Sequence, residues 1–74
     1  MTGGEFLSWL STYKNCGTTP IEGQNITGFS IKIICKTTGR FYYFSGPFGD
    51  RIIPVRFIKE VCDELWLDYP PGIQ

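Results

Sequence analysis

The fold of this chain is decided by residues 29–44, which read FSIKIICKTTGRFYYF. The first seven of these residues alternate between apolar and polar, except at Ile34, with the period of two that is typical of a β-strand. A turn-forming segment, Thr37-Thr38-Gly39, follows, and four consecutive aromatic residues come directly after Arg40. The stretch therefore predicts a β-hairpin. Because neighbouring strand residues point to opposite faces, the four aromatic side chains must occupy both faces of this hairpin.

The turn chemistry favours one register of the hairpin over another. A three-residue loop, Thr37-Thr38-Gly39 with the glycine in the left-handed region, suits a hairpin with a G1 bulge. A two-residue loop, Thr38-Gly39, is the alternative, but a β-branched threonine disfavours the positive φ of a type I′ turn. We therefore expect the three-residue loop. It gives a core face of Phe29, Ile31, Ile33, Cys35, Phe41 and Tyr43, and an outer face of Lys32, Ile34, Lys36, Arg40, Tyr42 and Phe44.

The alternative register changes only which aromatic residues lie outside. It keeps Lys32, Ile34 and Lys36 on the outer face and places Phe41 and Tyr43 beside them. Both registers thus predict one aliphatic and aromatic face for the core and one cationic face with interleaved aromatic residues.

The flanking segments predict a helix on each side of the hairpin. Thr2 and Glu5 have the spacing of a capping box, and an apolar stripe of Phe6, Trp9, Leu10 and Tyr13 follows, with Gly17 as the expected stop. Residues 18–28 are rich in turn formers and are expected to be a loop, whereas residues 51–53 are expected to add a short third strand. Pro54 suits the start of a second helix whose buried stripe is Ile58, Val61, Cys62 and Leu65, bordered by Val55 and Trp66.

The predicted fold class is therefore α+β: one small domain over residues 1–74, consisting of a helix, an antiparallel β-hairpin with a short third strand, and a second helix. Residues 68–74 contain consecutive prolines and are expected to form an extended C-terminal tail.

Charge is segregated along the chain although the formal net charge is zero. Residues 23–59 hold six basic side chains and one acidic one, and residues 60–74 hold four acidic side chains and no basic one. Acidic residues in the last turns of a helix oppose the macrodipole at a cost of a few tenths of a kcal/mol each. A solvated helix face is the simpler interpretation of this acidic end, and a surface that meets a basic partner is the other.

The sequence offers no recognisable catalytic or metal-binding motif. It contains three widely spaced cysteines and no histidine, which fits neither a zinc site nor imidazole catalysis. We expect free, buried thiols, and one disulfide with an odd thiol is the alternative. We expect no cofactor, no bound metal and no enzymatic activity. The sequence shows no leader-like segment and no long apolar run, so we expect a cytoplasmic protein that does not interact with membranes.

The outer face of the hairpin is the best candidate for function. Aromatic residues and arginine dominate interface energetics, so we expect a protein-binding module that acts as an inhibitor, an adaptor or a homodimer. The binding residues would be Lys32, Ile34, Lys36, Arg40, Tyr42 and Phe44. Single-stranded nucleic acid is a second candidate partner for the same face, although the zero net charge weighs against it. Coverage of this face by the loop over 18–28 or by the tail is the structural alternative.

Overall fold

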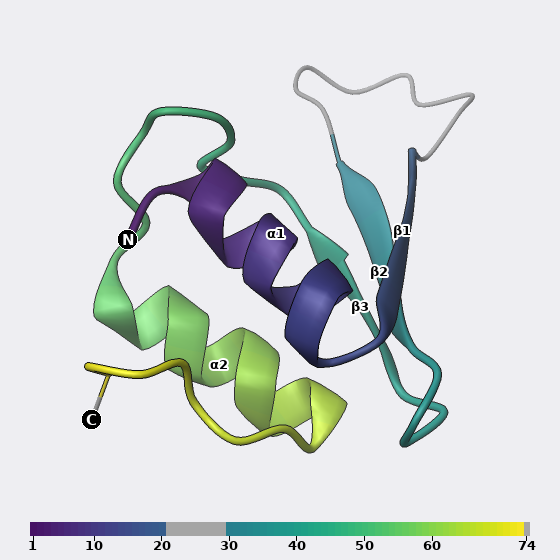
Figure 1. Cartoon of the computed structure of the whole chain (residues 1–74). Helices are drawn as coiled ribbons and strands as arrows, with labels where there is room; N and C mark the ends of the chain where they lie inside the picture. The colour runs from purple at the N-terminus through teal and green to yellow at the C-terminus, as the bar shows by residue number, and fades with distance from the viewer. Residues whose placement is uncertain (21–29, 74) are drawn as a thin grey trace.

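The computed structural model describes residues 1–20 and 30–73. Within these residues the chain forms an α+β fold, as the sequence predicts (Figure 1). The elements in chain order are α1 (Gly3–Tyr13), β1 (Cys16–Pro20), β2 (Ile31–Cys35), β3 (Phe41–Phe44) and α2 (Val55–Leu65). The strands form an antiparallel sheet in the order β1-β2-β3. Figure 1 shows both helices on the same side of this sheet.

Helix α1 begins where the capping box predicts. The Glu5 amide donates to Thr2 Oγ1 at 3.1 Å, and the Thr2 amide donates to Glu5 Oε1 at 2.8 Å. The helix ends at Tyr13, earlier than the predicted stop at Gly17, because Asn15 adopts a left-handed φ of 54° and turns the chain into β1. Tyr13 is consequently 75% exposed, so its predicted place on the buried stripe is wrong.

The third strand of the sheet comes from a segment that was expected to be a loop. Thr18 and Thr19 belong to β1, which pairs with β2, and β-branched residues suit such a strand. The rest of that loop prediction, residues 21–28, lies outside the described residues, as does Phe29. The strand predicted over 51–53 is wrong, because Ile52 forms only an isolated bridge with Thr2 and this segment pairs with the N-terminus instead.

The hairpin register differs from both predicted registers. Ile34 pairs with Phe41, and a four-residue turn, Lys36 to Gly39, connects the strands. Two backbone bonds close this turn: the Gly39 amide donates to the Cys35 carbonyl, and the Cys35 amide donates to the Arg40 carbonyl, both at 2.8 Å. Gly39 supplies the left-handed conformation that the turn requires, with φ of 76°. The aromatic residues therefore lie on faces opposite to those of the preferred register, whereas the alternative register gave the observed faces, with Phe41 and Tyr43 outside.

The core lies between the sheet and the two helices. The predicted stripe of α2 is confirmed, since Ile58, Val61, Cys62 and Leu65 are all buried. The strands contribute Cys16, Ile31, Ile33, Cys35 and Phe44, and helix α1 contributes Phe6 and Leu10. All three cysteines are buried and free, as expected. After α2 the chain turns back beside that helix (Figure 1), where Pro70 is buried and the Tyr69 hydroxyl donates to Asp63 Oδ1 at 2.8 Å.

Candidate binding surface

The face of the sheet opposite the helices is the candidate site, and we call it the open sheet face. The register places six residues on it: Gly17, Thr19, Lys32, Ile34, Phe41 and Tyr43. Its apolar members are well exposed, with Ile34 at 37%, Phe41 at 51% and Tyr43 at 55%. Because an exposed aromatic pair is costly to leave in water, a partner that covered this face would gain binding energy.

Contacts within the open sheet face hold its side chains in a fixed arrangement. The rings of Phe41 and Tyr43 meet edge to face, with centroids 5.5 Å apart. Lys32 Nζ lies 4.7 Å from the centroid of the Phe41 ring, which is within the range of a cation–π interaction. The stem of Lys36 also lies beside this face, since a Cβ added at Gly17 would be 3.8 Å from Lys36 Cε. The result is an aromatic platform with two ammonium groups around it.

The structure divides the six residues that were predicted to bind. Lys32, Ile34 and Lys36 lie on or beside the open sheet face as expected. Arg40 lies instead at the end of α2, where its Nε donates to the Glu64 carbonyl at 3.3 Å and its guanidinium stacks 4.4 Å from the Trp66 ring.

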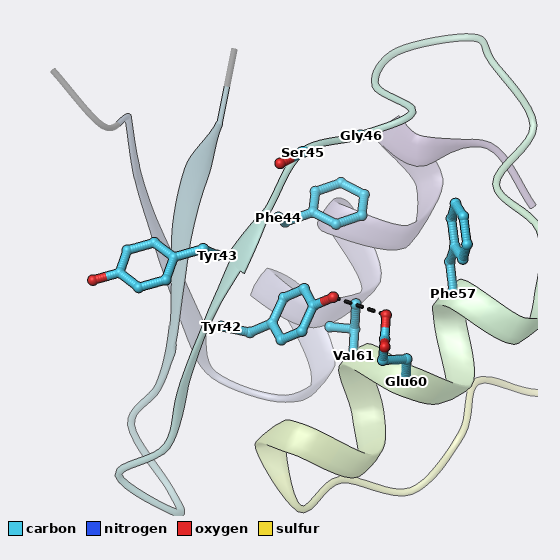
Figure 2. Close-up of a pocket in the computed structure, with 8 residues that line it drawn as sticks. All are labelled: Tyr42, Tyr43, Phe44, Ser45, Gly46, Phe57, Glu60 and Val61. Atoms are coloured by element: carbon cyan, nitrogen blue, oxygen red, sulfur yellow. Dashed lines mark hydrogen bonds between the residues drawn. The ribbon is translucent and has the colours of Figure 1, made fainter. Parts of the chain in front are cut away.

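Tyr42 and Phe44 point toward the helices, so their predicted place on the outer face is wrong. Phe44 is only 2% exposed and packs edge to face against Phe6 and Phe48. The Tyr42 hydroxyl donates to Glu60 Oε2 at 3.0 Å (Figure 2). Burial raises the pKa of Tyr42, and the neighbouring Glu60 raises it further, so the phenol keeps its proton and remains a donor. Phe41 and Tyr43, which the preferred register missed, take their places outside.

A shallow groove of about 180 Å³ separates β3 from α2. Its lining consists of Tyr42, Tyr43, Phe44, Ser45, Gly46, Phe57, Glu60 and Val61. Figure 2 shows Tyr42 and Phe44 pointing from β3 toward α2, whereas Tyr43 points to the other side of the strand. The groove is therefore mainly apolar, and Glu60 supplies a carboxylate at its helical wall.

Metal-ligating groups, thiols and helix length complete the description of the surface chemistry. No group of three His, Cys, Asp or Glu side chains within residues 1–20 and 30–73 is arranged to hold a metal ion. Burial raises the pKa of Cys16 to about 12 and that of Cys62 to about 11, so both thiols stay protonated and are poor nucleophiles near neutral pH. In the part of the chain that the structure describes, no helix is both long and apolar enough to cross a membrane.

In comparisons with known proteins, no protein-family model, curated protein or solved structure matches this chain.

Proposed function

We propose that this protein is a small protein-binding module, an adaptor or inhibitor without enzymatic activity, that binds its partner through the open sheet face. The observation that carries this proposal is the exposed pair of Phe41 and Tyr43 with Lys32 held against it. Rigid aromatic side chains are the residues that most often dominate binding energy, because they bury a large area at a small entropic cost.

The charge of the open sheet face indicates the kind of surface that it fits. Lys32 lies on the face and Lys36 lies beside it, and none of the six residues that define the face is acidic. A partner surface with an apolar centre and acidic residues around it would be complementary in both respects. Two copies of this chain packed face to face would bring their lysines together, so a different protein fits better than a homodimer.

A photo-crosslinking experiment tests this function. Benzoylphenylalanine is placed at Tyr43 and, as a matched control, at Tyr13, which is exposed and is the last residue of α1. In an extract of the cells that make the protein, we expect a discrete crosslinked partner from position 43 and none from position 13. The identified partner is then titrated with the purified protein.

Substitutions on the face complete this test. Phe41→Ser and Lys32→Glu should each weaken binding of the partner, the former by about tenfold or more, as expected for an interface anchor. Equal affinity of both variants and the wild type would contradict the proposal, as would crosslinking that is equally strong from both positions.

Single-stranded nucleic acid is the second candidate partner, favoured by the same platform of Phe41 and Tyr43 beside lysines. Bases stack on exposed aromatic rings while lysines neutralise phosphates. Fluorescence titration with labelled single-stranded DNA and RNA at low and moderate salt separates the two functions. A Kd weaker than about 100 μM even at low salt rules out nucleic acid, because non-specific binding normally reaches 10⁻⁴ to 10⁻⁶ M at physiological salt.

A further inference from the structure

The backbone of β3 presents unpaired hydrogen-bonding groups at one edge of the sheet. The Cys35 amide donates to the Arg40 carbonyl, which makes these two residues a hydrogen-bonded pair. Because such pairs alternate along an antiparallel ladder, Tyr42 and Phe44 also direct their backbone groups toward β2. The N–H and C=O groups of Phe41 and Tyr43 consequently point away from β2, to the free edge.

The opposite edge of the sheet is less suitable for pairing. The Lys36 amide donates to the Asn15 carbonyl, so by the same alternation Cys16, Thr18 and Pro20 face outward from β1. Pro20 has no N–H, and a proline at such a position is a common protection of an edge strand. Strand β3 has no such protection, because Phe41–Phe44 contains neither a proline nor a charged residue.

Side-chain sites lie on both sides of the β3 edge. Toward the helices, the groove beside β3 has Phe57, Val61 and Glu60 on its α2 wall (Figure 2). Toward the other side, Phe41 and Tyr43 project from the open sheet face with Lys32 against them. An added strand points its side chains alternately to these two sides, which is the arrangement that gives specificity when a peptide joins a sheet.

We propose that the β3 edge accepts an extended segment of a partner protein as a fourth strand, which pairs with the backbone groups of Phe41 and Tyr43. This inference rests on the proposed function and specifies how the partner binds. The segment alternates in chemistry: acidic residues lie over the open sheet face near Lys32, and apolar residues enter the groove against Phe57 and Val61. The last side chain of the segment on the groove side is basic and reaches Glu60.

Charge argues against a second copy of the chain as the added strand. Pairing β3 with β3 of another copy across a two-fold axis would bring two α2 helices to the same side of the joined sheet. Each α2 carries Glu60 and Glu64 near β3, where Glu60 accepts from Tyr42, and where burial and both carboxylates raise the pKa of that phenol. Like charges would thus approach each other, whereas a partner segment with a basic residue is complementary there.

A designed peptide tests the proposal directly. The probe is acetyl-Glu-Val-Glu-Leu-Thr-Lys-amide. Its odd positions are acidic or polar, and its even positions are valine, leucine and a terminal lysine. Its control has the same composition in the order Val-Leu-Glu-Glu-Lys-Thr, which lacks the alternation. With the probe at roughly 1 mM, a concentration that detects weak binding, we expect amide exchange at Phe41 and Tyr43 to slow by about tenfold, as for newly hydrogen-bonded amides.

Proline substitution isolates the contribution of the backbone. Tyr43→Pro removes an outward N–H but no bond to β2, since edge positions tolerate proline. Tyr43→Ala is the matched control, because it loses the same side chain and keeps the N–H. We expect Tyr43→Pro to bind the probe about tenfold more weakly than Tyr43→Ala, a typical penalty for an unmade bond. Phe57→Lys, at the exposed groove wall, should weaken binding by a similar factor and covers the case in which the proline variant does not fold.

Four results would overturn the inference. The first is an absence of exchange protection with the probe, and the second is equal protection by the control peptide. The third is that Tyr43→Pro binds the probe as tightly as Tyr43→Ala does, or that Phe57→Lys binds it as tightly as the wild type does. The fourth is a dimer in sedimentation equilibrium whose Phe41 and Tyr43 amides are protected without peptide, which would assign the edge to a second copy. The proposed function fails separately, since it depends on crosslinking from position 43 and on Phe41→Ser.

Discussion

Gly3 shows how one residue sets the contact between α1 and a distant part of the chain. It is buried in the first turn of α1, and its amide donates to the Arg51 carbonyl at 2.9 Å. A Cβ at this position would overlap the Pro47 carbonyl oxygen and lie 2.9 Å from Phe48 Cα. Only glycine therefore allows the helix to approach the connection between β3 and α2 so closely.

We predict that Gly3→Ala lowers the free energy of unfolding by about 2 kcal/mol, a typical cost of overpacking a closely packed site. Gly17→Ala is the control, because the nearest atom to its added methyl group is Lys36 Cε at 3.8 Å. Urea unfolding of both variants checks the prediction. Equal stability of the two variants would show that the Pro47 backbone moves away without cost.

The sequence predicts where α1 begins, but it does not predict that position 3 must be glycine. The capping box of Thr2 and Glu5 is readable because its two partners are three residues apart and follow a known spacing. The requirement for glycine at position 3 is not readable, because the group that excludes a side chain is the Pro47 carbonyl, far along the chain.

At the scale of secondary-structure elements, the hairpin turn is tied to the end of α2. Thr38 Oγ1 donates to the Leu65 carbonyl at 2.9 Å, and this carbonyl is at the helix terminus, where it has no intrahelical partner. Such a bond supports a four-residue turn that local turn chemistry would not select. Strands β2 and β3 could be predicted from the alternating stretch and the aromatic run that follows the turn, whereas β1 was expected to be a loop. The register of the hairpin could not be predicted, because a contact between distant elements contributes to it.

We predict that Thr38→Ala lowers the free energy of unfolding by about 1 kcal/mol, the net value of a typical hydrogen bond. Thr37→Ala removes the neighbouring, exposed hydroxyl and serves as the control, with an expected change within about 0.5 kcal/mol. Thermal unfolding measures both changes. A Thr38→Ala variant as stable as Thr37→Ala would indicate that water replaces the threonine at the Leu65 carbonyl.

At the scale of the whole molecule, the one-sided arrangement of helices explains which part of the site could be predicted. Within residues 1–20 and 30–73 both helices lie on one face of the sheet, and the open sheet face is the other. The cationic residues Lys32 and Lys36 were placed there from alternation alone. The preferred register assigned the aromatic residues to the wrong faces, since a one-residue change of register moves every side chain of a strand to the opposite face, whereas the alternative register assigned them correctly. The groove beside β3 was not predicted, because it depends on how α2 lies against that strand.

Titration of the buried thiols makes the stability of the whole molecule depend on pH. An exposed thiol has a pKa near 9.0, whereas burial raises the pKa of Cys16 to about 12 and that of Cys62 to about 11 in the folded chain. Below pH 9 the thiols of Cys16 and Cys62 are protonated in both the folded and the unfolded chain, so the free energy of unfolding keeps its full value. As pH rises from about 9 toward 12, the unfolded chain releases protons from Cys16 and Cys62 that the folded chain retains, so the free energy of unfolding falls. Cys35 acts in the opposite direction, because burial raises its pKa less than hydrogen bonds from Thr38 and Thr37 lower it.

We predict that the urea midpoint is nearly constant up to about pH 8.5 and decreases clearly by about pH 10.5, within the window set by these pKa values. Tyr42, whose pKa burial also raises, acts in the same direction at the upper end of this window. The double variant Cys16→Ala and Cys62→Ala should lose less stability over the same interval, because its thiols no longer titrate. An equally steep decline in that variant would assign the alkaline instability to tyrosines such as Tyr42. A midpoint independent of pH would show that the cysteines are as accessible to solvent when folded as when unfolded.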